Sequence, residues 1–266
     1  MSNRYTVKRE KSINGHHNSG KRVQSGVKRY TYPRKPSAQP HYLEREELAE
    51  IVGFLKKGDP GLYRTMQQYP RTIWIAGGFI RSFLNGETIC DIDVFGCDLM
   101  YMGMAIEACR AETKAAMKKT RYTITMDGAI APVQFITSAV YPNARHCIDL
   151  FDFTVCQAAI WYQGGRWHSA CSEYFHQDLE KKRLRYTSPN RVDENPIAWL
   201  YRVKRYVDKG YFLPDEDRLK LLERFFRSNP SELECGERDF YPPSLFGKAV
   251  AYASSHWKGV QDDYVL

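Results

Sequence analysis

Two short stretches near the middle of the chain decide its fold: residues 76–81 read Ala-Gly-Gly-Phe-Ile-Arg, and residues 90–95 read Cys-Asp-Ile-Asp-Val-Phe. A short apolar run leads into the first stretch and predicts a buried strand, after which the Gly-Gly turn opens a helix. The second stretch alternates acidic and apolar residues, which predicts a strand with one polar face. Side chains two positions apart on a strand point to the same side of a sheet, so we expect Asp91 and Asp93 to lie side by side.

This arrangement predicts a phosphate-transfer site. Paired carboxylates are ligands that suit Mg²⁺ or Mn²⁺, and Asp91 and Asp93 are therefore the predicted metal ligands and catalytic residues. Gly77 and Gly78 are predicted to seat a triphosphate on bare backbone N–H groups at the start of a helix. Arg81, one turn further on, is placed to brace the same phosphates. Each part is weak alone; their order and spacing together favour nucleotide chemistry.

The two stretches, GGFIRSFLNGE and CDIDVFG, resemble the signature of the DNA polymerase beta-like nucleotidyltransferase superfamily. The pattern is most similar to the bacterial-type tRNA nucleotidyltransferase and poly(A) polymerase branch. The resemblance continues more faintly to about residue 212. Its further parts are residues 151–158, 178–185 and 194–211. It implies an α+β protein, with a nucleotidyltransferase fold of mixed sheet and flanking helices followed by a helical domain.

The resemblance also implies a third carboxylate, whose position is uncertain in this chain. Many members carry it in the middle of a strand, and the matching strand here has Gln134. A glutamine cannot serve as a charged ligand or a base. Asp152 is the better candidate for the third catalytic acid and Asp149 the next, while a purely structural role for Asp152 stays open.

The base-reading residues of the branch are replaced. Asn195 and Ala198 stand where the branch has an Asp and an Arg that hydrogen-bond the incoming base, so CCA addition is not carried over. We still expect Asn195 to lie at the nucleotide. Arg202 and Arg205 are predicted to contact triphosphate or RNA, and the alternative is a solvated helix face.

Positive charge is concentrated at one end of the chain. The protein has a net charge of +8, yet residues 1–40 carry ten Lys or Arg and one Glu, whereas the remainder carries 29 basic and 30 acidic side chains. The first 40 residues are also poor in apolar side chains, which predicts a flexible basic tail that contacts RNA. A merely solubilising tail is the alternative. The tail is followed by a predicted catalytic domain over 41–167 and a helical domain over 168–266.

Several protein classes are excluded by composition. The chain has no run of 18 apolar residues and no apolar leader, so we expect neither a membrane span nor a secretory signal. Seven scattered cysteines indicate reduced thiols, and the expected location is cytoplasmic.

The sequence thus predicts a template-independent nucleotidyltransferase. It would move a nucleoside monophosphate from an NTP to an acceptor hydroxyl, most simply the 3′ end of an RNA, with two Mg²⁺. Two alternatives remain open. One is transfer to a protein or a small molecule, as in toxin-type members, and the other is a degenerate nucleotidyltransferase that serves as an RNA-binding scaffold.

Overall fold

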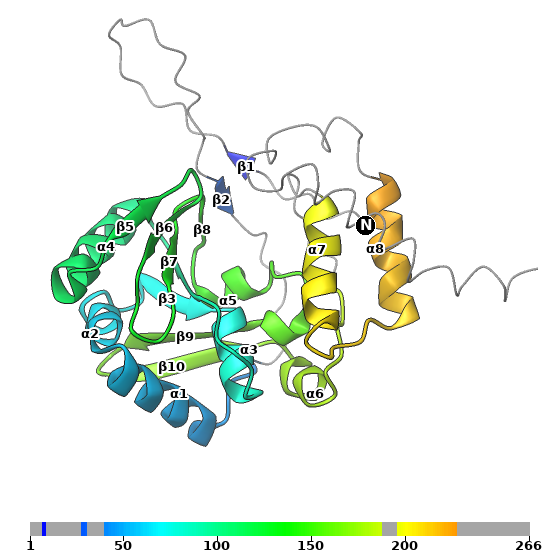
Figure 1. Ribbon diagram of the computed structural model, residues 1–266, viewed down its shortest axis with the longest axis horizontal. Helices are drawn as coiled ribbons and strands as arrows, with labels where there is room; N and C mark the ends of the chain where they lie inside the picture. The colour runs from blue at the N-terminus through cyan, green and yellow to red at the C-terminus, as the bar shows by residue number, and fades with distance from the viewer. Residues whose placement is uncertain (1–6, 9–27, 31–39, 188–195, 228–266) are drawn as a thin grey trace, which may run out of the picture.

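The computed structural model describes residues 7–8, 28–30, 40–187 and 196–227 (Figure 1). The helices are α1 Arg45–Gly58, α2 Pro60–Gln68, α3 Gly78–Leu84, α4 Leu99–Thr113, α5 Ala144–Ile148, α6 Phe175–Glu180, α7 Pro196–Val207 and α8 Asp215–Arg227, with a 3-10 turn at Thr154–Cys156. The strands are β1 Val7–Lys8, β2 Lys28–Tyr30, β3 Ile73–Ala76, β4 Ile92–Gly96, β5 Met117–Lys119, β6 Thr123–Met126, β7 Val133–Ile136, β8 Ala139–Val140, β9 Ala158–Gln163 and β10 Arg166–Cys171.

A mixed sheet of seven strands is the centre of the molecule. Its order is β10-β9-β3-β4-β7-β6-β5, and every neighbouring pair is antiparallel except β4 and β7. The strand β3 (Ile-Trp-Ile-Ala) is buried along its whole length, because both of its faces are covered. These elements confirm the α+β class predicted from the sequence.

Helices cover the two faces of the sheet unequally. On one face α1 packs against β10, α2 against β9 and α4 against β4, and the core on this side includes Val94 and Phe135. On the other face, α5 packs against β10, β9, β3 and β4. Asp93 is on this second face, because it alternates with the core residues Ile92 and Val94 along β4. The site is therefore built on the less covered side of the sheet.

Two helix boundaries differ from those the sequence predicts. Gly58-Asp59-Pro60 ends α1 as expected, but it also starts α2: the Asp59 carboxylate accepts a hydrogen bond of 3.0 Å from the Leu62 N–H, and proline suits the first helical position. The residue pattern alone predicts a helix over 103–117, whereas α4 begins earlier, at Leu99, where the Asp98 side chain caps it. It ends at Thr113, since Lys114 adopts a left-handed conformation with φ 52°.

The predicted hairpin turn at Gly164-Gly165 joins β9 to β10. The prediction that the chain becomes helical after Trp167 is wrong for its first residues, because β10 pairs with β9 as far as Cys171. The expected domain boundary at 167 therefore falls within a strand. Beyond the sheet, α7 and α8 share a second apolar core with the 3-10 turn. A helix expected near residues 244–256 lies outside the described residues.

Part of the predicted basic tail has defined structure. The strand β2 pairs in parallel with β8, with Lys28 opposite Ala139 and Arg29 opposite Val140, and β1 pairs with β2. The expectation of an entirely unstructured segment is thus wrong for residues 28–30. Local sequence could not predict this, because the residues are held by backbone pairing with a strand about 110 positions further along the chain.

No helix in the described part of the chain is long and apolar enough to cross a membrane. The described cysteines are all free thiols, as the sequence predicts.

Candidate active site

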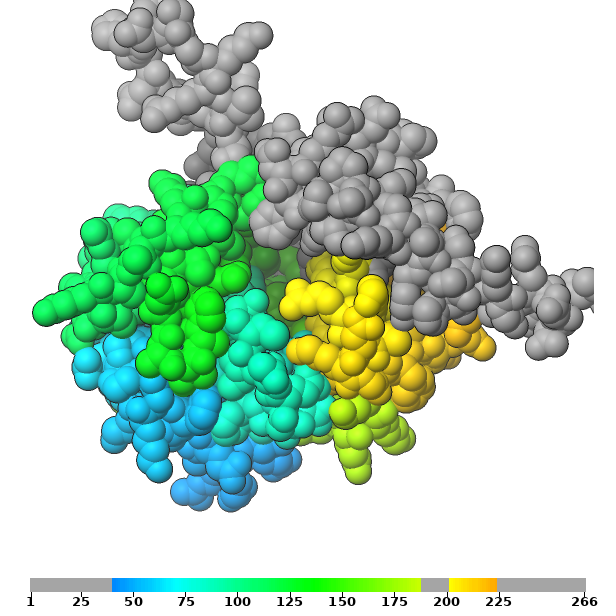
Figure 2. Space-filling view, viewed as in Figure 1, coloured from blue at the N-terminus to red at the C-terminus, as the bar shows by residue number. Residues whose placement is uncertain are grey.

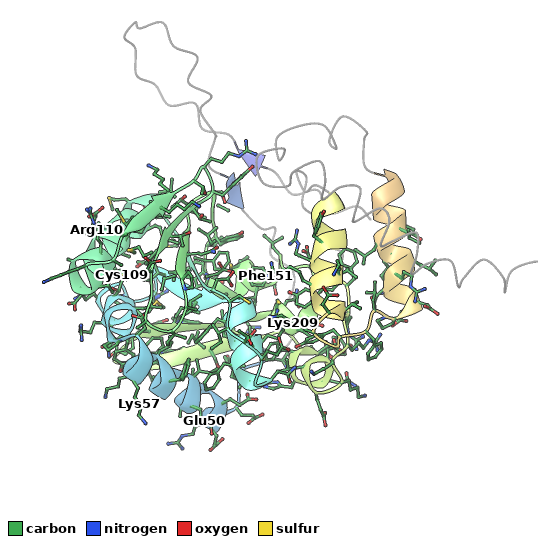
Figure 3. The ribbon with its side chains drawn as sticks, in the orientation of Figure 1. Glu50, Lys57, Cys109, Arg110, Phe151 and Lys209 are labelled. Atoms are coloured by element: carbon green, nitrogen blue, oxygen red, sulfur yellow. The ribbon has the colours of Figure 1, made fainter. Side chains whose placement is uncertain are left out.

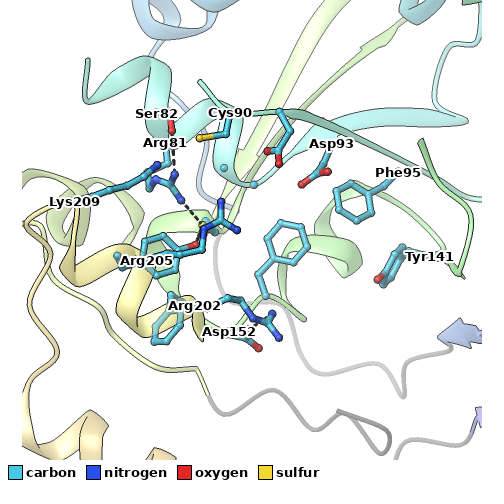
Figure 4. Close-up of a pocket in the computed structure, with 17 residues that line it drawn as sticks. Arg81, Ser82, Cys90, Asp93, Phe95, Tyr141, Asp152, Arg202, Arg205 and Lys209 are labelled. Atoms are coloured by element: carbon cyan, nitrogen blue, oxygen red, sulfur yellow. Dashed lines mark hydrogen bonds and ion pairs between the residues drawn. The ribbon is translucent and has the colours of Figure 1, made fainter. Parts of the chain in front are cut away.

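A pocket of about 320 Å³ lies between the sheet and α7 (Figure 4). It brings together residues that are far apart in the sequence, from the β3–α3 turn, β4, the segment after α5, and α7. Eight of the predicted site residues line this pocket: Gly77, Gly78, Arg81, Asp91, Asp93, Asp152, Arg202 and Arg205. Asn195 lies outside the described residues.

Asp91 and Asp93 form the acidic wall of the pocket. Asp91 directly precedes β4 and Asp93 is its second residue, so the expected pairing on one face is present. Burial and, to a smaller extent, the negative charge of Asp91 raise the pKa of Asp93, the cation of Arg205 offsets part of the rise, and the resulting pKa is about 7. Two carboxylates crowded in this way are stabilised by a cation between them, and hard oxygen ligands suit Mg²⁺ or Mn²⁺. The residues present therefore fit the expected metal.

The glycine turn packs tightly against the pocket wall. Gly77 has φ 89°, a conformation that residues with a side chain rarely adopt, and a Cβ there would meet the ring of Phe151 at 3.3 Å. Its N–H donates to the Ala158 carbonyl at 3.0 Å. The expectation that Gly77 leaves a bare N–H for phosphate is therefore wrong, since strand β9 takes that donor. Gly78 begins α3 and also lines the pocket.

Arg81 lies in the pocket wall with its guanidinium held by neighbours on all sides. Its Nε donates to Glu87 at 3.3 Å, and its two terminal nitrogens donate to the Cys156 thiol at 3.3 Å and the Ser82 hydroxyl at 3.0 Å. The guanidinium also lies 4.9 Å from the centre of the Tyr206 ring. Arg81 is 6% exposed, so these contacts leave it little surface for a ligand.

Glu87 connects this wall to the end of α7. Besides Arg81, its carboxylate accepts hydrogen bonds from the Tyr211 hydroxyl at 2.6 Å and the Lys209 ammonium at 3.4 Å. Asn85 donates to both Glu87 and Tyr211. The network fixes the helical part of the chain against α3, and it positions Arg81.

Asp152 is buried and forms an ion pair with Arg202 of α7. In Figure 4 these two residues lie together at the side of the pocket away from Asp93. The described residues contain no group of three or more His, Cys, Asp or Glu side chains placed to hold one metal ion. Asp152, the first candidate for the third catalytic acid, therefore lines the pocket while paired with an arginine of α7, and its catalytic role stays a prediction. Asp149, the second candidate, is exposed at the end of α5 and does not line the pocket.

The basic residues of α7 divide between two faces of the helix. Arg202 and Arg205 line the pocket at the spacing of one helix face, as does Lys209 just after the end of α7, whereas Lys204 pairs with Asp208 at 2.5 Å. Arg205 is exposed, and it forms no ion pair with a carboxylate in the part of the chain that the structure describes. It is therefore free to meet an anionic ligand.

Aromatic residues that the sequence analysis missed complete the pocket. Phe95 contacts Tyr141 and Phe151, with ring centres 6.0 and 5.5 Å apart, and Tyr206 donates or accepts a 2.8 Å hydrogen bond with the Cys156 thiol. Phe95 could have been predicted from the sequence, because it is two residues after Asp93 and therefore on the same face of β4. Tyr141 offered no such signal, because the return of the chain after β8 places it there.

Residues 43–182 match the family described as Gabija anti-defense 2 family protein. This stretch is more than half of the chain and contains the glycine turn and both acidic residues of β4. The chain belongs to the Gabija anti-defense 2 family. A curated relative, Gabija anti-defense 2 of Bacillus phage SPbetaL7, is 26% identical over 151 residues. The match covers 56% of this chain and 36% of the relative, so the chain spans about a third of that protein's length.

Solved structures show the same fold. The chain is similar to a Thermotoga maritima CCA-adding enzyme complexed with tRNA, with a TM-score of 0.51, 15% identity, and coverage of 78% of this chain and 53% of that one. It is similar to a CCA-adding enzyme in complex with ATP, with a TM-score of 0.53, 15% identity, and coverage of 82% and 55%. These likenesses confirm the predicted nucleotidyltransferase fold. Membership of the tRNA nucleotidyltransferase branch stays a prediction, because a sequence identity this low shows only that the fold is shared.

Proposed function

We propose that this member of the Gabija anti-defense 2 family is a metal-dependent nucleotidyltransferase that uses an NTP. The observation that carries the proposal is the juxtaposition of Asp91 and Asp93 with the cation of Arg205 in one pocket of a nucleotidyltransferase fold. Such an arrangement suits a metal-bound triphosphate, because the metal ion complements the carboxylates and the phosphate anions complement the arginine.

The proposed reaction is a phosphoryl displacement. The acceptor hydroxyl oxygen forms a bond to the α-phosphorus of the NTP, the bond from that phosphorus to the bridging oxygen breaks, and pyrophosphate leaves with the electron pair while the hydroxyl loses its proton. Asp91 and Asp93 would hold Mg²⁺ or Mn²⁺, which when bound neutralises phosphate charge and polarises the reacting phosphorus. Arg205 would bind the triphosphate, while Arg81 holds Tyr206 and Glu87 in place.

The proposed acceptor is the 3′ hydroxyl of an RNA. The positive charge of residues 1–40 supports this choice, and so does the pairing of Arg29 in β2 with Val140, the residue before Tyr141 of the pocket. The name of the family states an action against Gabija, and we propose that nucleotide transfer is the means of that action. The proposed site of action is the cytoplasm.

A second candidate is a degenerate nucleotidyltransferase that binds nucleic acid without transfer. Gln134 favours it, because this residue pairs with Asp93 across β4 and β7 at the place where a third carboxylate would stand. The intact Asp91 and Asp93 favour the enzyme.

One experiment tests the proposal. The full chain is incubated with each α-labelled NTP, Mg²⁺ or Mn²⁺, and either total RNA or total protein. We expect label in RNA, and a loss of about a hundredfold or more in Asp91→Asn and in Asp93→Asn, since metal charge stabilisation is worth several kcal/mol. Asp127→Asn is the matched control, because Asp127 is an exposed carboxylate outside the pocket.

The outcomes separate the alternatives. Label in protein moves the acceptor to a protein side chain. No label in any fraction, with wild-type protein that still binds RNA, favours the degenerate scaffold. Activity within about tenfold of wild type in either pocket variant contradicts the assignment of Asp91 and Asp93.

A further inference from the structure

The face of the sheet that carries Asp93 continues beyond the pocket onto β7, β6 and β5. The helix α5 packs on the other half of this face, against β10, β9, β3 and β4. The helix α4 packs on the opposite side of β4 and β7, where the core residues lie (Figure 1). The side chains of β7 and β6 on the Asp93 side are therefore only half-buried, and those of β5 are exposed.

Strand register places a polar row on this face. Asp93 pairs with Gln134, Gln134 with Thr125, and Thr125 with Lys118. Residues paired across neighbouring strands point to the same side of a sheet. Neighbouring strands lie about 4.8 Å apart, so the three steps carry the row roughly 14 Å from Asp93 to Lys118. We call Gln134, Thr125 and Lys118 the polar shelf.

The far end of the polar shelf is strongly basic. Lys114, Lys118, Lys119 and Arg121 are all exposed, and no acidic residue occurs between Lys114 and Met126. None of the four forms an ion pair with a carboxylate among residues that the structure describes. The guanidinium of Arg121 lies 4.4 Å from the centre of the Tyr122 ring. This end of the sheet therefore presents unneutralised positive charge beside a ring that can stack.

The space over the shelf is open on the pocket side. Figure 2 shows the surface hollowed between the green strands and the yellow α7. Figure 3 shows Phe151 and Lys209 on the inner side of this region, whereas Lys57 and Glu50 extend outward from α1 at the other end of the molecule. The strand β2 (Lys-Arg-Tyr) lies at the same end of the sheet, where it pairs with β8. The two residues before β8, Thr137 and Ser138, donate their N–H groups to the Tyr122 carbonyl, which links this end to β6.

We propose that the polar shelf binds the acceptor as a single-stranded nucleic acid, with Lys118 on a backbone phosphate and Gln134 and Thr125 hydrogen-bonding along the strand toward Asp93. This inference rests on the proposed function and names the surface on which its acceptor lies. A phosphodiester backbone fits the shelf, because its residues offer two hydrogen-bonding side chains and a cation. The polar shelf is long enough to hold a few nucleotides, counted from the reacting hydroxyl.

Lys118 and Lys119 form a matched pair for the test. Both are exposed on β5 and carry the same charge, but successive side chains of a strand point to opposite faces, so only Lys118 is on the shelf. Lysines on an exposed edge strand also hinder pairing with other sheets, and that role would involve both residues alike. A difference between the two variants therefore reports the shelf.

The experiment is fluorescence anisotropy with the full chain and a labelled RNA of about 12 nucleotides, with a DNA of the same sequence as a second arm. We expect Lys118→Glu to weaken binding by about fivefold or more. It should also make the log–log salt slope shallower by roughly the amount that one phosphate contact contributes. Lys119→Glu should change the affinity by less than about twofold. Equal losses in RNA and DNA show that the shelf reads the phosphate backbone. A loss in RNA alone adds a contact to the 2′-hydroxyl and supports the same surface.

Transfer assays on the same variants separate this inference from the proposed function. Loss of binding in Lys118→Glu without any transferase activity in wild type supports the shelf and contradicts the enzyme. Transfer to RNA that is equally efficient in wild type and Lys118→Glu, with unchanged affinity, overturns the shelf while the enzyme stands. Equal losses in the Lys118 and Lys119 variants also overturn it, since general charge alone explains them.

Discussion

Arg202 of α7 forms an ion pair with the buried carboxylate of Asp152, and this contact fastens the helical part of the chain to the sheet beside the pocket. Asp152 is 3% exposed as a residue, whereas the Arg202 side chain keeps 33% of its surface. The two partners therefore differ in what their loss leaves behind. Loss of Asp152 leaves an arginine that can turn to water, whereas loss of Arg202 leaves a carboxylate that is buried.

We expect Arg202→Gln to lower the free energy of unfolding by about 3 kcal/mol, because breaking a buried pair strands a charge. Asp152→Asn should cost less, and the double variant Asp152→Asn with Arg202→Gln should recover part of the loss. Urea unfolding of the four proteins measures this. Transfer within about tenfold of wild type in Asp152→Asn fits a positioning role, and a loss as large as that of Asp93→Asn would instead make Asp152 a catalytic acid.

Arg205 and Lys204 are neighbours on α7 with different surroundings, which makes them a second matched pair. Arg205 lines the pocket, and Lys204 pairs with Asp208 on the other side of the helix. Arg205→Ala should lower kcat/KM for the NTP by about 10- to 100-fold, because a hydrogen bond to a charged group is worth about 1.5–3 kcal/mol. Lys204→Ala should change it by less than about twofold. Steady-state kinetics decide, and equal effects would remove Arg205 from the triphosphate site.

The raised pKa of Asp93 predicts a pH-dependent stability. Its ordinary value is 3.8 and burial with the charge of Asp91 raises it to about 7, so between these values the folded protein holds a proton that the unfolded chain has lost. Stability then falls as pH rises through this window. Asp93→Asn removes the effect, and its gain in Tm over wild type, without metal, should be larger at pH 8 than at pH 5.

Scanning calorimetry at the two pH values measures this gain, at about 2–4 °C per kcal/mol for a chain of this size. Added Mg²⁺ should raise the Tm of wild type at pH 8 and leave Asp93→Asn nearly unchanged. A gain that is the same at both pH values would show that Asp93 titrates normally.

The sequence alone supplied the parts of the site that depend on local spacing. Asp91 and Asp93 share a face because they are two residues apart on one strand, and Arg202 and Arg205 because they are three apart on one helix. The place of Lys118 could not be predicted in this way, since it depends on the register of three strand pairs. The engagement of the Gly77 N–H by Ala158 depends likewise on a strand 80 residues later.

The basic N-terminal residues offer a graded test of RNA binding. Deleting residues 1–27 removes six Lys or Arg and one Glu but leaves β2 and its pairing with β8. We expect a smaller salt slope, by roughly 0.7 for each lost contact to single-stranded phosphate, with the Tm unchanged. Deleting residues 1–31 also removes β2, and it should lower the Tm as well, since β8 loses its partner. An unchanged slope in both proteins would exclude this segment from RNA contact.

Base selection is where this chain departs most from the branch that it resembles. Ala198 is on α7, four residues before Arg202 and so one helical turn away from a residue that lines the pocket. If an Arg at this position and an Asp at 195 read the base in the branch, then Ala198 and Asn195 leave the base edge with a methyl group and a neutral amide. An amide both donates and accepts, so it can pair with several bases.

We therefore expect a relaxed or purine-leaning choice of NTP, set by pocket size and stacking on the aromatic wall rather than by hydrogen bonds to the base edge. Strong selection requires buried polar groups that the wrong base leaves unpaired, and the replacements remove them. The double variant Ala198→Arg with Asn195→Asp should sharpen selection toward C or A, while Lys204→Ala serves as a control on the same helix. Values of kcat/KM for the four NTPs measure the outcome. A wild-type protein that already prefers one pyrimidine by about a thousandfold would show that residues elsewhere in the chain read the base.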